Sequence, residues 1–268
     1  MEIYISSNFL DSKDLFDSIK ILKKNGFVNI ELTGGKKYEK DIFNRLNYLK
    51  KKYNFNFFFH NYFPVPRKSF VINLCSLNDE IYNKSIDFCI GSIKLANKLS
   101  IKKYSVHAGF FFDFKPSEAG MQKTKKILSN REEALSRFYN AWTILKKNNI
   151  GPTKLYIENN VYSKADQQIF GNSKPYMLLD YKDYMEVSSK IKFDLLLDLA
   201  HLYVTSNSLQ LKFEKQLRNF INKTEYLHYS ENNMINDSNH GLDKYNNIFS
   251  EIKKYDFLKK IITLEIYD

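Results

Sequence analysis

Eight short runs rich in apolar, β-branched and aromatic residues recur along this chain, separated by longer stretches with helical periodicity. This alternation is typical of repeated βα units, in which helices cover a parallel sheet. Eight units close a (β/α)8, or TIM, barrel, and such barrels commonly have about 250 residues. We therefore expect an α/β fold with one barrel domain over residues 1–268. The expected strands are residues 3–6, 28–32, 55–60, 104–107, 155–158, 195–198, 226–228 and 261–266.

The stretches between these runs carry helix signals. Leu15, Phe16, Ile19 and Leu22 share one helical face, and Gly26 follows as a stop. Further amphipathic runs cover residues 79–99, 176–190, 207–222 and 243–254. No linker, repeat or low-complexity tract separates them, so the sequence gives no sign of a domain boundary.

One helix start is expected at a capping box. Ser129 and Glu132 have the spacing in which each side chain bonds the other residue's backbone N–H. An apolar helical face follows from Ala134 onward. We therefore expect Ser129 to begin this helix.

Several protein classes are disfavoured by composition. The N-terminus lacks a basic segment followed by an apolar one, and no apolar run approaches the roughly 20 residues that cross a bilayer. We expect a cytoplasmic protein without a membrane partner. Cys75 and Cys89 lack CxxC spacing, so buried free thiols are expected rather than a disulfide or a cysteine zinc site.

The formal net charge of +11 leaves two readings open. Many lysines, such as Lys23, Lys24 and those at 50–52, lie near expected helix ends, where they complement the helix dipole. A solvated basic surface is therefore favoured over DNA binding. The same charge favours an anionic substrate.

Polar side chains close six of the expected strands. One such residue alone would be read as a satisfied structural group, but six at the inner ends of barrel strands require partners or a metal. The reason is that desolvating a carboxylate costs several kcal/mol. These residues are His60, His107, Glu158, Asp198, His228 and Glu265.

Four of these residues lie on neighbouring strands. Glu158, Asp198, His228 and Glu265 are therefore expected to converge on a divalent cation such as Zn²⁺, Mn²⁺ or Co²⁺, with the number of ions left open. Five further residues are candidates for additional metal or substrate contacts: His60 and His107 at their strand ends, His201 just past the sixth strand, and Asp237 and His240 after the seventh. All five histidines of the chain thus fall on the expected active face.

Two long connections, at residues 61–78 and 108–130, follow strands on that same face and are candidate walls of a substrate site. Basic residues concentrate in the loops after strands two to four. We expect Lys36, Lys37, Arg67 and Lys68 to bind an anion, with Lys115, Lys123, Lys125 and Lys126 in the same group.

The ordered motifs HNY, VHAG, IENN, LDLAH, LHYSEN and LEIYD resemble the xylose isomerase-like barrel superfamily over essentially the whole chain. That superfamily includes sugar isomerases and epimerases and also endonuclease IV. For the epimerases, the resemblance implies that the positions of Glu158, Asp198, His228 and Glu265 bind one metal. It further implies that the two glutamates move protons and that His201 touches the substrate.

For endonuclease IV, the resemblance implies three zinc ions. The same four positions would hold them together with those of His60, His107 and the Asp237/His240 pair. The segment INLCSLNDEIYNKSID is also similar to that branch.

Three departures from endonuclease IV favour a small-molecule enzyme. NNVYS follows Glu158 where that family has a glycine-rich stretch, and two residues rather than one separate Asp237 from His240. The insert FPVPRKSF lengthens a loop that would enter DNA, although Tyr62 and Phe63 are candidate stacking residues.

The leading prediction is a metal-dependent isomerase or epimerase acting on a sugar, with sugar phosphates and nucleotide sugars as candidate anionic substrates. The alternative is a zinc-dependent, endonuclease IV-like phosphodiesterase acting at abasic DNA. The third alternative is a barrel that binds a ligand without catalysis. It is the least favoured, because it does not explain why polar residues are buried at the strand ends despite their desolvation cost.

The chain ends three residues after Glu265, so no full covering helix follows the eighth strand in this sequence. We expect Ile262, Leu264 and Ile266 to be partly bare. Exposed apolar patches mark interfaces, so we expect either another segment of the same chain or a second subunit to cover this flank, with a homodimer as the simpler symmetric solution.

Overall fold

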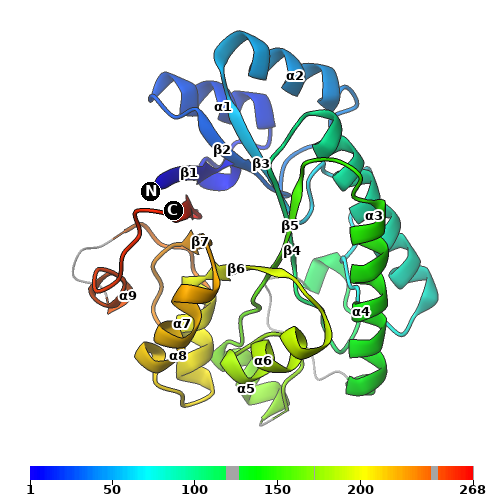
Figure 1. Cartoon of the computed structure of the whole chain (residues 1–268), viewed down its shortest axis with the longest axis vertical. Helices are drawn as coiled ribbons and strands as arrows, with labels where there is room; N and C mark the ends of the chain where they lie inside the picture. The colour runs from blue at the N-terminus through cyan, green and yellow to red at the C-terminus, as the bar shows by residue number, and fades with distance from the viewer. Residues whose placement is uncertain (119–126, 172, 243–246, 268) are drawn as a thin grey trace.

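Eight parallel strands close into a barrel in the order β1 to β8 in the computed structural model, which describes residues 1–118, 127–171, 173–242 and 247–267. β1 pairs with β8 and thereby closes the sheet beside the two chain ends (Figure 1). The strands are Glu2–Ser6, Asn29–Leu32, Asn56–His60, Lys103–His107, Lys154–Glu158, Asp194–Asp198, Tyr226–Tyr229 and Ile261–Leu264. The expected barrel is confirmed, with strand bounds that differ from the prediction by one or two residues.

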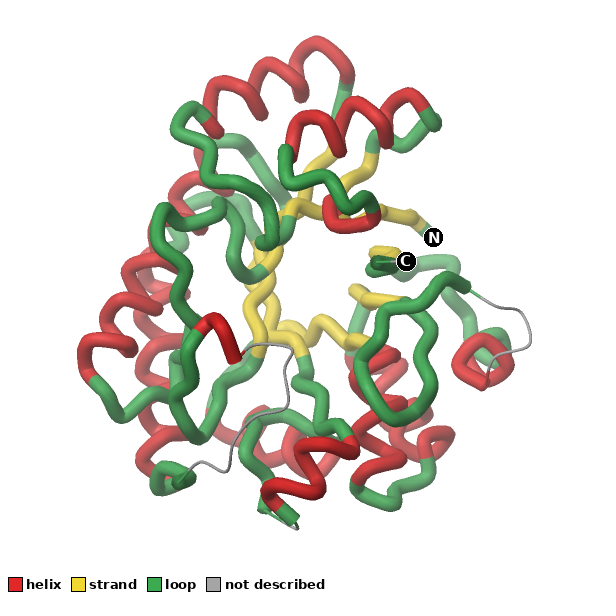
Figure 2. The backbone as a smooth tube through the Cα atoms, turned by 180° about the vertical axis from the view of Figure 1, so that it is seen from behind, coloured by secondary structure: helices red, strands yellow, loops and turns green. Residues whose placement is uncertain are grey.

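Helices surround this ring of strands on the outside (Figure 2). The α-helices are α1 Leu15–Lys24, α2 Ile42–Tyr53, α3 Asp79–Lys98, α4 Arg131–Asn148, α5 Lys164–Phe170, α6 Tyr181–Lys190, α7 Leu199–Ser208, α8 Phe213–Phe220 and α9 Asn247–Ile252. Short 3-10 turns occupy Ser7–Phe9, Pro116–Glu118 and Ile221–Lys223. Within the described ranges, no helix combines the length and apolar character needed to span a membrane.

Two helix starts differ from the prediction. Asn130, not Ser129, caps α4, because its side chain accepts from the backbone N–H groups of Glu132 and Glu133. The run expected at 176–190 becomes helical only at Tyr181, since Leu178 has a φ of 63° and Asp180 then caps α6. Left-handed backbone at a leucine is incompatible with a continuous right-handed helix.

The expected helix at 207–222 is also divided. α7 ends at Ser208, and the chain turns through Gln210, whose φ of 56° breaks the helix before α8 begins at Phe213. Of the expected run at 243–254, residues 243–246 lie outside the described ranges and α9 covers 247–252.

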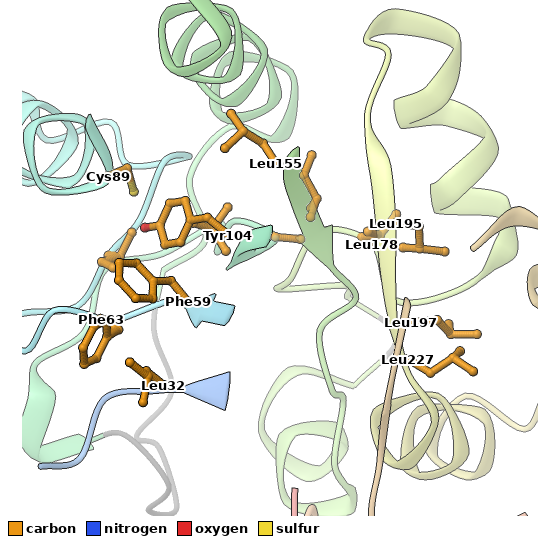
Figure 3. Packing of buried hydrophobic residues seen from close by; sticks show 14 of the residues in the cluster. Leu32, Phe59, Phe63, Cys89, Tyr104, Leu155, Leu178, Leu195, Leu197 and Leu227 are labelled. Carbon is orange, nitrogen blue, oxygen red and sulfur yellow. The ribbon is translucent and has the colours of Figure 1, made fainter. Parts of the chain in front are cut away.

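Alternation along the strands separates two layers of side chains. Residues such as Phe59, Tyr104 and Leu197 face outward and pack against the helices (Figure 3). A second cluster of buried side chains contains Tyr4, Phe58, Tyr156, Leu196 and Tyr226. Four of them, Phe58, Tyr156, Leu196 and Tyr226, lie two positions before His60, Glu158, Asp198 and His228, respectively. Side chains two positions apart on a strand share a face, so these four also point into the barrel. They form an apolar floor beneath the carboxyl ends of the strands.

The flank beside β8 is covered rather than bare. Ile262 and Ile266 are each 8% exposed, and Ile262 belongs to the same buried cluster as Ile248 and Ile252 of α9. The expectation of a partly bare flank is therefore wrong for Ile262 and Ile266, which are buried within the described part of the chain, whereas Leu264 is half-buried. These residues therefore give no support for a homodimer, which stays a prediction.

Candidate metal centre

Four strand-end side chains meet above the apolar floor. Glu158 ends β5, Asp198 ends β6, His228 lies in β7, and Glu265 directly follows β8. One ligand atom from each lies within 4.8 Å of the others. His228 Nδ1 is 2.9 Å from Glu265 Oε2, 3.4 Å from Glu158 Oε1 and 3.8 Å from Asp198 Oδ2. The group predicted from the sequence is thus brought together in space.

Three of the four residues present buried atoms without hydrogen bonds to any described residue. Both carboxylate oxygens of Glu158, Oδ2 of Asp198 and Nδ1 of His228 are buried without a hydrogen-bond partner in the described part of the chain. Leaving charged oxygens unsatisfied in a buried site is costly. Oxygen and imidazole ligands suit Zn²⁺, Mn²⁺ and Co²⁺, so a divalent cation fits the donors that are present.

The local structure explains why Asp198 presents one oxygen to the cluster. Asp198 is the N-cap of α7, and its Oδ1 accepts from the backbone N–H of His201. The Asn159 side chain also makes two hydrogen bonds to the Asp198 backbone: its Oδ1 accepts from the Asp198 N–H at 2.7 Å, and its Nδ2 donates to the Asp198 carbonyl oxygen at 3.1 Å. The carboxylate is therefore fixed through Oδ1 and the backbone, and Oδ2 remains directed to the group.

The electrostatics are those of crowded buried carboxylates and imidazoles. Burial, followed by the neighbouring Glu158, raises the pKa of Asp198 to about 7, although His201 opposes this. Burial also acts to raise the pKa of Glu265, but the nearby His228 outweighs it and lowers that pKa to about 2. Burial acts to lower the pKa of His228, yet the surrounding carboxylates raise it well above its usual value.

His60 and His107 lie on the other side of Glu158. His60 Nε2 and His107 Nδ1 are each 3.2 Å from Glu158 Oε2, and the three residues form a second group within 4.8 Å. Ser105 Oγ lies 2.8 Å from His60 Nδ1 and leaves Nε2 facing Glu158. Burial, joined by the charge of His60, lowers the pKa of His107 to about 4.

His201 and Asp237 complete one side of the site. His201 Nε2 lies 3.2 Å from Asp237 Oδ2, and Nδ1 lies 2.8 Å from the carbonyl oxygen of Asn159. The side chains of Asp237 and His107 are 23% and 28% exposed, whereas that of Glu158 is fully buried. The site therefore reaches solvent beside these two residues.

His240 is not brought into the groups above. It is exposed, and its backbone pairs with that of Glu231 in an isolated bridge. The candidate role of His240 in metal or substrate binding thus has no support from its position.

Glu31 is a member of the site that the sequence prediction missed. It lies inside β2 and is fully buried, with Oε1 2.9 Å from His228 Nε2. Glu31, His60 and His228 form a third group within 4.8 Å. The available signal was a glutamate between two apolar residues in VNIEL, but it does not end its strand as the other ligands do.

The candidate anion-binding residues fall into two kinds. Lys36 is buried, and its Nζ donates to the carbonyl oxygens of Leu10 and Ser12 at 2.8 and 2.7 Å. Lys37, Arg67 and Lys68 are exposed. Lys115 is exposed too, whereas Lys123, Lys125 and Lys126 lie outside the described residues.

The candidate stacking residues Tyr62 and Phe63 are engaged within the protein. Phe63 is 1% exposed and packs on Phe59 with ring centroids 4.6 Å apart. The Tyr62 hydroxyl accepts from the backbone N–H of Ile72. Phe63 is therefore a core residue and presents no free ring for a base, which corrects the stacking prediction.

A curated protein shares detectable sequence similarity with this chain. Apurinic-apyrimidinic endonuclease 1 of Plasmodium berghei (strain Anka) is 25% identical over 226 residues, which are 81% of this chain and 39% of that protein. The chain thus spans well under half the length of this curated relative.

The solved structures that resemble the chain share its fold at low sequence identity. A D-tagatose 3-epimerase-like protein has a TM-score of 0.70 at 16% identity, covering 100% of this chain and 91% of that one. D-Psicose 3-epimerase from Clostridium cellulolyticum has a TM-score of 0.65 at 12% identity, with 99% and 85% covered. Endonuclease IV from Thermus thermophilus has a TM-score of 0.59 at 12% identity, with 98% and 91% covered.

A family model provides the assignment. The model described as "Xylose isomerase-like TIM barrel" matches residues 19–268, which include every strand except β1 and every candidate ligand. The chain belongs to the xylose isomerase-like TIM barrel family.

Proposed function

We propose that this protein is a metal-dependent isomerase or epimerase that moves a proton between carbons of a sugar or sugar derivative. The observation that carries the proposal is the group of Glu158, Asp198, His228 and Glu265, in which the first three present buried atoms without hydrogen bonds in the described part of the chain. Asp198 and His228 come from the two middle strands of this group and are assigned to hold the cation. Glu158 and Glu265 come from its outer strands and are assigned to proton transfer as well.

The charge state of the two glutamates supports this division. Burial would raise the pKa of each, but neighbouring histidines lower both pKa values below the usual range. Both glutamates are therefore carboxylates at neutral pH, and each can accept a proton from a carbon next to a carbonyl. One glutamate takes the proton from the substrate carbon, while the other takes a proton from solvent and donates it to the neighbouring carbon or to the opposite face. The first glutamate then releases its proton to solvent, so both return to the carboxylate form. The chemistry that a bound cation supplies here is stabilisation of negative charge on a substrate oxygen.

His201 and Asp237 lie on the solvent-accessible side of the site, where a substrate would enter, and we assign them to orienting it. They contact each other at 3.2 Å, and Asp237 is partly exposed. We assign them to hydroxyl groups of the substrate. Arg67, Lys68 and Lys37 are assigned to a phosphate or nucleotide-linked group, since they are exposed on loops after β2 and β3. Lys36 is left out of this assignment because two carbonyl oxygens already accept from its ammonium group.

A second candidate function is phosphodiester cleavage at abasic DNA. The group of His60, His107 and Glu158 favours it, because additional imidazoles beside the first group would allow a second metal. The Plasmodium berghei relative supports it also. The burial of Phe63 and the exposed position of His240 count against it.

Solvent deuterium exchange separates the two functions. The purified protein is incubated in D2O with Zn²⁺, Mn²⁺ or Co²⁺ and a panel of ketoses, sugar phosphates and nucleotide sugars, and carbon-bound deuterium is followed by NMR. The same preparations are given a duplex with one abasic site. We expect deuterium in a sugar and an intact duplex. The matched control is His240→Gln, which removes a histidine on the same face outside the groups and should keep full exchange. Cleavage of the duplex without deuterium in any sugar would establish the second candidate instead.

A further inference from the structure

Glu31 and His228 are joined across the inside of the barrel. Glu31 comes from β2 and His228 from β7, and both are fully buried. Glu31 Oε1 lies 2.9 Å from His228 Nε2, on the side of the ring away from the four-ligand group. His228 Nδ1, on the opposite side, faces the carboxylates of Glu158, Asp198 and Glu265.

The other oxygen of Glu31 is held by two hydroxyl groups. Tyr226 and Thr263 both donate to Oε2. Tyr226 precedes His228 by two positions and belongs to the apolar floor, while Thr263 comes from β8. With two donors on Oε2, the orientation of the carboxylate is set and Oε1 remains an acceptor for His228.

This arrangement decides which nitrogen of His228 carries the proton. A histidine that binds a metal is neutral, so its imidazole has one N–H donor and one lone pair. The ionised carboxylate of Glu31 can accept a hydrogen bond but cannot donate one, so in the neutral ring the proton belongs on Nε2, which lies 2.9 Å from Glu31 Oε1. The lone pair is then on Nδ1, the atom that faces the group and makes no hydrogen bond of its own in the described part of the chain.

We propose that Glu31 is the positioning residue of the metal centre, which fixes the Nδ1 lone pair of His228 toward the cation and holds the ring in place. The proposal rests on the proposed function only in requiring that the four-ligand group binds a metal. Carboxylates that hold a metal-bound imidazole through its other nitrogen commonly raise metal affinity about 10–100-fold.

Two alternatives are disfavoured by the contacts of Glu31. Glu31 Oε1 is 3.6 Å from His60 Nδ1, but Ser105 Oγ already lies 2.8 Å from that nitrogen. Glu31 could itself bind a cation with His60 and His228, since the three lie within 4.8 Å. Its two oxygens already accept from three donors, however, whereas both oxygens of Glu158 lack hydrogen bonds.

The test compares two substitutions at one site. Glu31→Met keeps the side-chain length but removes the acceptor, whereas Glu31→Gln keeps an oxygen that can accept from His228. Zinc affinity is measured by competition with a chelator, without substrate. In the zinc-loaded protein with ¹⁵N-labelled histidine, NMR reports which nitrogen of His228 carries the proton. A melt in chelator checks that each variant is folded.

We expect Glu31→Met to bind zinc about 10–100-fold more weakly and to lose the slowly exchanging Nε2–H signal of His228. Glu31→Gln is expected to keep that signal and to recover part of the affinity. If Glu31→Met does not fold, Thr263→Val takes its place. This variant removes one donor to Glu31 Oε2 at nearly constant side-chain volume. We expect it to lose zinc affinity too, by a smaller factor than Glu31→Met.

Unchanged zinc affinity together with an unchanged Nε2–H signal in Glu31→Met, or in Thr263→Val where that variant stands in, would overturn the proposal. So would a zinc-bound structure with the ion on Glu31, or a Glu31→Gln variant as weak as Glu31→Met. Failure to find sugar turnover would leave these readouts unaffected, since they need only the protein and zinc. If the unmodified protein turns over a sugar but Glu31→Met keeps normal zinc affinity and the Nε2–H signal, the proposed function stands and only the role of Glu31 is overturned.

Discussion

The Asp198 carboxylate accepts a hydrogen bond from the backbone N–H of His201 at 2.7 Å, so the residue that ends β6 also begins α7. The same side chain presents Oδ2 to His228 and Glu158 without a hydrogen bond of its own. One short segment thus combines a structural role and a ligand role. Substitutions at Asp198 can separate them.

Asp198→Asn and Asp198→Ala should differ in stability but not in metal binding. Asparagine is as good an N-cap as aspartate, whereas alanine at an N-cap costs about 0.5–2 kcal/mol. In chelator, urea unfolding should therefore show Asp198→Ala as the less stable of the two. Both variants should bind zinc weakly, because the Oδ2 charge is absent. Equal free energies of unfolding would show that the cap contributes nothing to α7.

Added metal should stabilise the folded protein. A cation that binds only the native state contributes about 2.7 kcal/mol at a concentration 100 times its Kd. We expect the melting temperature to rise with zinc, manganese or cobalt and to fall back when a chelator is added. The double variant Glu158→Gln/Asp198→Asn should show no rise, and His240→Gln should behave like the unmodified protein. A rise of the same size in the double variant would place the metal elsewhere.

Glu158→Gln and Glu265→Gln should each abolish turnover while the barrel stays folded. Glutamine preserves the shape but cannot accept a proton, and general acid–base groups commonly contribute about 10²–10⁴-fold to the rate. Both variants lose a charged ligand too, so kcat is measured at saturating metal and substrate. Near-normal kcat in both variants would remove these glutamates from the mechanism.

The alternation of strand residues is what made the barrel and its main ligands predictable. Each of Glu158, Asp198 and His228 follows an apolar inner residue by two positions, and that spacing is visible in the sequence. Parallel strands then bring the carboxyl ends to one face. Glu31 was not predicted because it lies within its strand, and only the contact across the barrel to His228 reveals its partner.

Other details depended on contacts that no local pattern encodes. Asn130 caps α4 in place of its neighbour Ser129, whose backbone N–H instead donates to the carbonyl oxygen of Phe111. Phe63 lies in a loop with two prolines, yet it packs on Phe59 in the core. In both cases the outcome depends on a contact with another segment, Phe111 for Ser129 and Phe59 for Phe63, which the local sequence does not show.

Recognition of an anionic substrate should depend on exposed rather than buried cations. Arg67→Gln and Lys68→Gln are expected to lower kcat/KM for a phosphorylated or nucleotide-linked sugar more than for the unmodified sugar, and the difference should shrink at high salt. Lys36→Met should instead lower stability, because Nζ donates to two carbonyl oxygens. Equal kcat/KM values for charged and neutral sugars at both salt concentrations would argue against electrostatic recognition.

The last prediction concerns Glu225, at the opposite end of the barrel from the metal centre. Its Oε1 accepts from the Tyr156 hydroxyl at 2.6 Å and lies 3.1 Å from Lys154 Nζ and 3.2 Å from Lys103 Nζ. The Tyr156 hydrogen bond, followed by these lysines, lowers the pKa of Glu225 to about 2 from a usual 4.5, although partial burial opposes this.

A carboxyl group with a lowered pKa in the folded state stabilises the fold at every pH above its unfolded value, and this contribution is lost as the pH falls toward the folded value. Glu225→Gln should therefore be less stable than the unmodified protein at pH 6, and the difference should narrow between pH 4.5 and 2. The side chain is 53% exposed, so solvent screening keeps the effect small. Urea unfolding at several pH values measures it, with Glu2→Gln, an exposed residue at the start of β1, as the control. A difference that stays constant from pH 6 down to the acid limit of folding would show that the lysines and Tyr156 do not stabilise the ionised form.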